Sequence, residues 1–220
     1  YGIKAGNHLI KHNKFDFIVS SYSPSASHWI ARSLKKLLNV PWVADFRDLW
    51  SDNPFTTSIW PFNKINASLE KMILRSADLI LTVSEPLRRI LENRYSVPCF
   101  TLENGFDPDE FNNLPPQNIF PIDNKIRFVH AGSIYPGKRN PEPFFIAIKE
   151  LIKAKLLSEE KVEIIFLGRD IDGIEKLSKY HGIYTLMKMP GHVDRLTALR
   201  YLRDASGLIF LENEEPGYEG

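Results

Sequence analysis

The sequence is poor in several features that mark particular classes of protein. Its 220 residues include one cysteine, Cys99, which excludes an internal disulfide and favours a reducing compartment. No apolar run is long enough to span a bilayer. The formal net charge is +1, so overall charge gives no reason to expect nucleic acid as a partner. The 43% hydrophobic and 25% charged residues are typical of a globular protein, with length for one large or two small domains.

Strand-like and helix-like segments alternate along the chain. Apolar, β-branched runs predict strands, and apolar residues at helical spacing predict helices between them. Strands are expected at 15–20, 42–45, 79–83, 98–102, 126–131, 162–167, 184–189 and 207–211. Helices are expected at 27–38, 64–76, from 84, 143–155, 171–180 and 194–204. Such alternation predicts right-handed crossovers and parallel sheets, which is an α/β fold.

The middle of the chain has a different composition. Residues 107–123 are rich in proline and asparagine, which is linker chemistry. We therefore predict a first domain at 1–115, a linker at 116–124 and a second domain at 125–220. Each domain is expected to be a Rossmann-like, doubly wound sheet, and the two are expected to face a cleft at the carboxyl ends of their strands. Because the chain begins without methionine and stops just after a strand-like run, we expect both domains to be incomplete parts of a longer protein.

The segment Ile126–Leu151 carries the strongest functional signal. A buried strand ends at Gly132, a loop with Gly137, Lys138 and Arg139 follows, and a helix begins after two prolines. Glycines let backbone N–H groups approach an anion, while cations and the helix dipole offset its charge. The segment therefore predicts a phosphate site. The alternative is an ordinary turn with cations on its surface.

The same loop resembles the P-loop of nucleotide triphosphatases but lacks parts of it. Gly132 and Gly137-Lys138 have the spacing G-x-x-x-x-G-K, yet Arg139 replaces the hydroxyl that would hold Mg²⁺. A P-loop helix would also contain Pro143 within its first two turns, where proline lacks a required N–H and clashes with the preceding turn. We therefore exclude a P-loop.

A second group of polar residues follows the predicted strand 42–45. Asp45, Arg47 and Asp48 lie there, and an arginine between two acids can orient a sugar hydroxyl or bind a phosphate. The alternative is an ion-pair turn that satisfies itself. Nearby aromatic residues either form a surface for an acceptor or lipid, or pack beneath the loop: Trp50, Phe55, Trp60 and Phe62.

Three further features lie near strand ends, and each has a plain alternative. His192 and Val193 follow Gly191 in a strand-to-helix loop that either contacts a nucleotide base or is a simple turn. The two D-x-D pairs, at 107–109 and 170–172, match divalent-cation ligands but stand where helix caps are needed. No His/Cys cluster has zinc spacing. The glutamates after the last strand either contact sugar hydroxyls or form an exposed acidic loop: Glu212, Glu214, Glu215 and Glu219.

Several of these stretches together resemble the retaining glycosyltransferases of family 4, which have the two-domain GT-B fold. The matching segments are DFIVSSYSPSASHWIARSLKKLLNVPWVADFRDLW, SADLILTVSEPLRRIL, ENGFDPDEF, FVHAGSIYPGKRNPEPFFIAI and VEIIFLG. They cover most of the chain in the expected order. The resemblance implies a GT-B fold, of which this chain would span the domain junction.

The resemblance implies donor-binding roles in the second domain. Arg139 matches the basic residue that contacts the donor diphosphate, and Lys138 stands beside it. Ser133 stands where many relatives have an additional phosphate-binding arginine, which is a departure. Gly191–Val193 match the loop that contacts the base. The implied donor-binding set is Gly132, Ser133, Gly137, Lys138, Arg139, Gly191, His192 and Val193.

The resemblance also implies catalytic roles for Arg47, Asp48 and Glu219. Arg47 stands where many relatives have a catalytic-region histidine, which is a second departure, and Asp48 matches the acid that follows. Glu219 is expected to be the first of the paired glutamates of the family, with the second beyond Gly220.

The function implied by the resemblance is transfer of a sugar, with retention, from a nucleotide-diphosphate donor to a glycan or lipid-linked acceptor in surface polysaccharide assembly. No metal and no cofactor are expected, because cations and helix N-termini take the charge of the leaving diphosphate. The rival functions are a nucleotide-sugar epimerase of the same fold and a non-catalytic binding or scaffold protein. We expect a cytoplasmic protein at the inner face of the membrane. Its helix 27–38 either makes peripheral membrane contact or packs on its own sheet.

Overall fold

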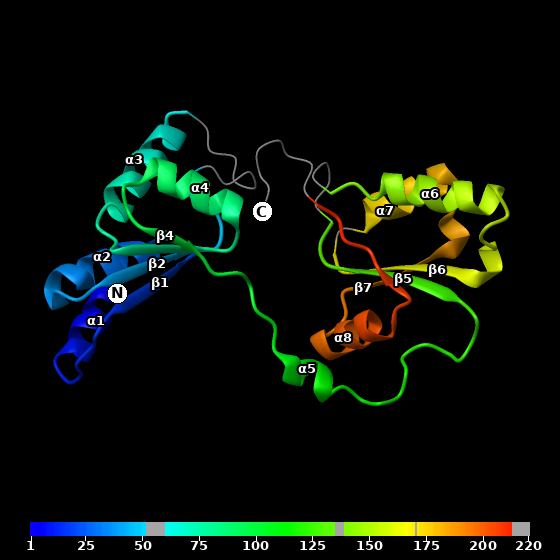
Figure 1. Cartoon of the computed structure of the whole chain (residues 1–220), viewed down its shortest axis with the longest axis horizontal. Coiled ribbons are helices and arrows are strands. Elements are labelled where there is room, and N and C mark those ends of the chain that lie inside the picture. The colour runs from blue at the N-terminus through cyan, green and yellow to red at the C-terminus, as the bar shows by residue number, and fades with distance from the viewer. Residues whose placement is uncertain (52–59, 135–138, 170, 213–220) are drawn as a thin grey trace. The chain divides into compact units, whose positions relative to one another are not determined.

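The computed structural model describes residues 1–51, 60–134, 139–169 and 171–212. Contacts divide the chain into two compact units, of which the first contains Tyr1–Gly105 and the second begins at Phe106. Each unit has its own four-stranded parallel sheet with helices between the strands (Figure 1).

The first unit is built on a sheet with the strand order β1-β2-β3-β4. The strands are β1 (Ile18–Tyr22), β2 (Trp42–Phe46), β3 (Leu79–Thr82) and β4 (Cys99–Thr101). The helices are α1 (Gly2–Ile10), α2 (Ala26–Leu38), α3 (Phe62–Leu74) and α4 (Glu85–Arg94). Since each strand is added beside the previous one in the same direction, right-handed crossovers place α2, α3 and α4 on one face of the sheet.

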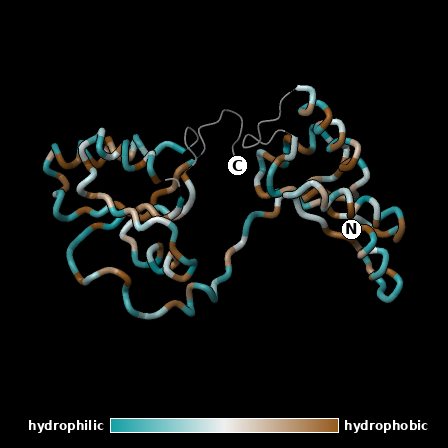
Figure 2. The backbone as a smooth tube through the Cα atoms, turned by 180° about the vertical axis from the view of Figure 1, so that it is seen from behind, coloured by the Kyte–Doolittle hydropathy of each residue, from teal (hydrophilic) through white to brown (hydrophobic). Residues whose placement is uncertain are grey.

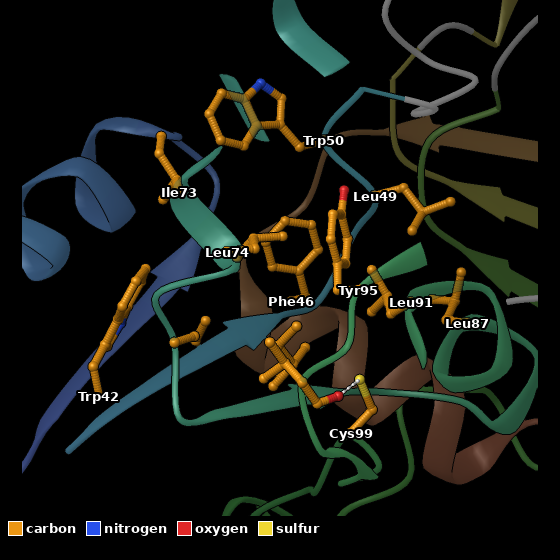
Figure 3. Packing of buried hydrophobic residues seen from close by; sticks show 14 of the residues in the cluster. Trp42, Phe46, Leu49, Trp50, Ile73, Leu74, Leu87, Leu91, Tyr95 and Cys99 are labelled. Carbon is orange, nitrogen blue, oxygen red and sulfur yellow. Dashed lines mark hydrogen bonds between the residues drawn. The ribbon is translucent and has the colours of Figure 1, made fainter. Parts of the chain in front are cut away.

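The core of the first unit lies between this sheet face and the three helices. Trp42 and Phe46 of β2 pack with Ile73 of α3 and Leu91 of α4, and all four side chains are 0% exposed (Figure 3). Burial of side chains of this size contributes roughly 1.5–3 kcal/mol each to stability. Cys99 is buried in the same core as a free thiol.

Part of the apolar side of α2 is covered by α1, whereas Leu37 near its end is 59% exposed. Gly2 and Gly6 of α1 lie against Ile30 and Leu34 of α2, so closely that a Cβ at Gly6 would come within 2.7 Å of Leu34. Packing was the alternative to membrane contact that the sequence left open for helix 27–38, and Ile30 and Leu34 pack in this way.

The second unit has the strand order β7-β6-β5-β8. The strands are β5 (Ile126–Ala131), β6 (Val162–Leu167), β7 (Met187–Gly191) and β8 (Gly207–Leu208). The helices are α5 (Pro108–Asn112), α6 (Glu142–Lys153), α7 (Asp172–His181) and α8 (Arg195–Asp204), with short 3-10 turns at Glu159–Lys161 and Tyr184–Leu186. The chain adds β6 and β7 on one side of β5 and then returns to add β8 on the other.

This reversal of direction decides where the helices lie. Helices α6 and α7 cover one face of the second sheet, and α8 covers the other (Figure 1). Phe145 of α6 packs with Phe166 on the first face, and Val129 packs with Tyr201 of α8 on the second. Hydrophobic colouring runs along the strands, whereas the outer turns are largely hydrophilic (Figure 2). In doubly wound sheets ligands bind at the carboxyl ends of the strands near such a reversal.

The structure differs from the sequence prediction at several elements. Strand β1 covers Ile18–Tyr22 rather than 15–20, and helix α5 was not predicted. Strand β7 begins at Met187, because the predicted start at 184 forms a 3-10 turn. Strand β8 covers Gly207–Leu208 rather than 207–211. Helix α1 was not predicted, because two glycines lower its helix propensity, and its packing on α2 compensates for them.

The segment between the two sheets belongs to the second unit by contact. Glu110 of α5 forms an ion pair with Arg195 of α8, and the Arg203 guanidinium donates to the carbonyl of Pro115 over 2.7 Å. The prediction drew the boundary of the first domain at 115, whereas these contacts group α5 with the second sheet.

Candidate functional site

The carboxyl ends of β5, β6 and β7 each carry a glycine, and the three backbones lie close together. Gly132 N–H donates to the Leu167 carbonyl over 3.0 Å, and Gly168 N–H donates to the Gly191 carbonyl over 2.9 Å. Gly168 has a φ of +139°, and a Cβ at this residue would lie 2.2 Å from the carbonyl oxygen of Gly132. Any larger residue at 168 would therefore force these strand ends apart.

A hollow of about 350 Å³ lies at these strand ends. This volume is within the range of small-molecule sites. The hollow brings together four residues that the sequence predicted for donor binding, Gly132, Ser133, His192 and Val193. Its complete lining is Ala131, Gly132, Ser133, Leu167, Gly168, Arg169, His192, Val193 and Ala198.

Arg169 is a lining residue that the sequence analysis missed. It is exposed and directly follows Gly168 at the end of β6, so it adds a cation to the hollow. The sequence contained a sign of this role. The strand before Gly168 is apolar and is followed by a glycine and a cation, as is the strand before Gly132, where the cations come later in the loop. The two loops become neighbours only because β5 and β6 pair in register, from Ile126 with Val162 to Ala131 with Leu167.

Arg139 lies half-buried beside the loop that follows β5. Its Nη1 donates to the carbonyl oxygen of Ser133 over 3.1 Å. Many relatives have an arginine at the position of Ser133. In this chain the backbone carbonyl of Ser133 instead binds the side chain of Arg139. Gly137 and Lys138, also predicted for donor binding, lie outside the described residues.

His130 lies at the end of β5 on the face that α6 covers, and it was not predicted as a site residue. It is 6% exposed, and its Nδ1 lies 3.0 Å from the carbonyl oxygen of Ile209. Burial lowers the pKa of His130, the hydrogen bond to Ile209 opposes this, and the charge of Arg139 lowers the pKa further. A polar residue in an otherwise apolar strand was the signal that could have found it.

The loop Gly191–Val193 leads into α8 at the same edge of the sheet. Asp194 caps the helix, because its carboxylate accepts from the backbone N–H of Thr197 over 3.0 Å. His192 is exposed at the rim of the hollow, and Val193 packs against the α8 face of the sheet. The predicted base-contacting loop is thus positioned by a capped helix.

The first unit holds Arg47 firmly at the carboxyl edge of its own sheet. Its Nε donates to Asp45 over 3.1 Å, and its Nη1 donates to the side-chain oxygen of Asn104. Asp45 also accepts from the hydroxyl of Ser21 over 3.0 Å. This is the ion-pair turn that the sequence left open as the alternative role. Asp48 follows as an exposed residue, and Glu219, the third predicted catalytic residue, lies outside the described residues.

The described aspartates of the two D-x-D pairs lie at the starts of helices. Asp107 caps α5, accepting from the backbone N–H of Asp109 over 2.9 Å, and Asp172 is the first residue of α7. Asp170 lies outside the described residues. Within the described part of the chain, no group of three or more His, Cys, Asp or Glu side chains is placed to hold a metal ion. Over the same residues, no helix is both long and apolar enough to cross a membrane.

Part of the chain matches a family model, and nearly the whole chain is similar in fold to solved structures. Residues 3–110 match the model of Glycosyltransferase Family 4. No curated protein matches the sequence. The solved structure of HepE from Anabaena, in complex with UDP and glucose, is similar with a TM-score of 0.64 and 13% identity over 94% of this chain and 55% of HepE.

Two other solved structures are similar over nearly the whole chain. The lipopolysaccharide outer core galactosyltransferase WaaB has a TM-score of 0.57 and 12% identity, covering 99% of this chain and 56% of WaaB. TarM has a TM-score of 0.64 and 14% identity, covering 94% of this chain and 38% of TarM. This chain therefore spans about half the length of these proteins or less. At such identities the likeness establishes the fold, and it confirms the predicted GT-B class with its two parallel, Rossmann-like sheets.

Proposed function

We propose that the second unit binds the sugar donor of a glycosyltransferase. Two findings support this: residues 3–110 match Glycosyltransferase Family 4, and both sheets are of the GT-B type. The donor is a nucleoside diphosphate sugar, and the acceptor is a glycan or a lipid-linked glycan. The observation that carries this proposal is the hollow at the ends of β5, β6 and β7, with its glycine edges and arginines.

The hollow suits the two ends of a nucleoside diphosphate in different ways. Backbone at Gly132 and Gly168 carries no side chain to keep an anion at a distance, and Arg169 lines the hollow with Arg139 beside the same loop. Guanidinium groups bind phosphate through several N–H donors at once. His192 and Val193 at the rim take the base. HepE is described with UDP and glucose, which supports UDP as the first nucleotide to test.

In the proposed reaction the bond between the anomeric carbon and the diphosphate oxygen breaks, and an acceptor hydroxyl forms a new bond to that carbon. The electron pair of the broken bond stays on the diphosphate, so Arg139 and Arg169 stabilise more negative charge in the transition state than in the ground state. The acceptor hydroxyl gives up its proton to the leaving diphosphate oxygen, so the products are the glycoside and the nucleoside diphosphate. We propose transfer with retention and without a metal ion, in assembly of surface polysaccharide, which the outer-core role of WaaB supports.

The proposal is tested by incubating the protein with a panel of nucleotide sugars, with and without acceptor glycans. We expect release of the nucleoside diphosphate that increases with acceptor, together with a glycosylated product. An epimerised sugar formed without any acceptor identifies an epimerase instead. Tight nucleotide binding with no product over the whole panel identifies a binding or scaffold protein, and absence of nucleotide binding contradicts the donor site itself.

A further inference from the structure

His181 is the last residue of α7, and its side chain is bonded to the first residue of α6. It is 9% exposed, and its Nε2 lies 2.7 Å from Oε1 of Glu142. An ionised carboxylate only accepts hydrogen bonds, so Nε2 is the N–H donor. Helix α7 is a firm anchor for this bond, because Ile174 and Ser178 on the same side of the helix are buried. The bond therefore holds the start of α6 to a fixed helix that comes later in the chain.

The residues that join Arg139 to Glu142 have little conformational freedom. Pro141 fixes its own φ, here −82°, and also restricts the backbone of Asn140 before it. Oδ1 of Asn140 accepts the backbone N–H of Glu142 over 2.9 Å. Because this segment is stiff, the position of Glu142 constrains the position of Arg139.

Arg139 connects this stiff segment to the hollow at the ends of β5, β6 and β7. Its Nη1 donates to the carbonyl oxygen of Ser133 over 3.1 Å, and Ser133 lines the hollow. A continuous path of bonds therefore runs from the end of α7, through the start of α6, to the edge of the hollow.

We propose that His181 is a positioning residue for the donor diphosphate. By holding Glu142 it fixes the start of α6, and it thereby keeps the guanidinium of Arg139 beside Ser133 at the edge of the hollow. The described residues that line the hollow do not include His181, so its effect on a ligand must pass through Arg139. This inference rests on the proposed function, because it requires a diphosphate at Arg139.

Calorimetric titration of the whole chain with UDP tests the inference. His181→Ala removes the bond to Glu142, and we expect UDP affinity to fall by about five-fold or more. His181→Gln should restore most of the affinity, because the glutamine amide can donate to Glu142 from nearly the position of Nε2. Thermal unfolding of each variant shows that the folded protein is being titrated.

Combined substitutions show whether the effect passes through Arg139. In the Arg139→Ala background, His181→Ala should cause no further loss of UDP affinity, since residues that act in one path are not additive. Glu142→Ala alone should reproduce the effect of His181→Ala. Lys179→Ala is the matched control, because it breaks an ion pair with Glu175 within the same helix and should leave UDP affinity unchanged.

The opposing outcomes are distinct from one another. Unchanged UDP affinity in His181→Ala, or an equal loss in His181→Ala and His181→Gln, would leave His181 with a structural role only. A further loss in the Arg139→Ala background would show that His181 does not act through Arg139. If the wild-type protein does not bind UDP, the proposed donor site fails and this inference fails with it.

Discussion

Arg139 is the single side chain on which the diphosphate proposal depends most. Its guanidinium lies beside the loop after β5, where Nη1 donates to the Ser133 carbonyl over 3.1 Å. This bond orients the planar group, and a charge-assisted bond from it to a phosphate contributes roughly 1.5–3 kcal/mol. Much of that contribution should appear in the transition state, because the diphosphate gains charge as the sugar leaves.

We expect Arg139→Ala to lower kcat/KM by about ten- to a hundred-fold or more. The melting temperature should change little, since loss of the bond to Ser133 costs only about 1 kcal/mol. Steady-state kinetics and thermal unfolding measure the two effects. Arg89→Ala is the control, because Arg89 is 71% exposed on α4 in the first unit. Full activity in Arg139→Ala, or loss of activity through unfolding alone, would show that the loop is a structural turn.

We expect His28 to make the stability of the first unit sensitive to acid. It is 0% exposed, its Nδ1 lies 2.7 Å from the Ser20 hydroxyl, and it stacks on Phe46 with 5.1 Å between centroids. Burial lowers its pKa from 6.5 to about 4, although the charge of Asp45 opposes the shift. Below about pH 6.5 the unfolded chain therefore binds a proton at His28. The folded unit does not bind this proton until the pH falls to about 4.

Stability from His28 is thus complete above pH 6.5 and falls by roughly 3 kcal/mol in total as the pH drops to 4. All four tryptophans belong to the first unit, so their fluorescence during urea unfolding reports on it. We expect His28→Phe to remove most of this dependence over pH 4–6.5. His12→Asn, at an exposed position, should leave it unchanged. An unaltered slope in His28→Phe would assign the acid sensitivity to other groups.

At the scale of elements, α3 presents several apolar side chains to solvent on one side. Phe62, Ile65 and Met72 are 65%, 49% and 42% exposed, and Trp60 just before the helix is 70% exposed. The acid of this helix, Glu70, is 0% exposed and accepts from the backbone N–H of Ser51 over 2.8 Å. The exposed apolar stripe therefore has no exposed acid within the helix.

The exposed cations of α3 and its C-terminus are Lys64, Lys71 and Arg75. A stripe of this kind suits an anionic bilayer, with roughly 1 kcal/mol per cation near the surface. We expect the protein to float with phosphatidylglycerol vesicles but not with phosphatidylcholine vesicles, and to be released by high salt. Substituting Phe62 and Ile65 by serine should abolish flotation. Leu37→Ser, at a 59% exposed position of α2, should not. Flotation that ignores lipid charge, or none at all, contradicts this role for α3.

Local sequence patterns predicted most helices and strands but could not show which of them lie next to one another. The apolar run at 126–131 and the prolines after it gave β5 and the start of α6 from sequence alone. Arg169 and His130 were missed because their roles come from the pairing of β5 with β6 and with β8, which are distant in sequence. Helix α1 was missed because its stability comes from contact with α2. The predicted site and the hollow differ in their residues because the pairing of strands that are distant in sequence decides which residues line the hollow. Local helix and strand propensity contains little of this information.

At the scale of the whole molecule, the proposed chemistry needs no divalent cation. In the proposed site Arg139 and Arg169 supply the positive charge for the diphosphate, and Asp107 is used as a helix cap. We expect transfer activity to be the same in EDTA as in buffer with Mg²⁺. Activity that EDTA abolishes and Mn²⁺ restores would assign the diphosphate charge to a metal ion.

The central claim is that a nucleotide sugar binds at the carboxyl ends of β5, β6 and β7. Hydrogen exchange of backbone amides, measured with and without saturating UDP-glucose, tests this position directly. The account predicts slower exchange in three segments, 131–134, 167–169 and 191–193, which line one hollow though they are far apart in sequence. Protection confined to the first unit, or no protection at these segments despite measured binding, would contradict it.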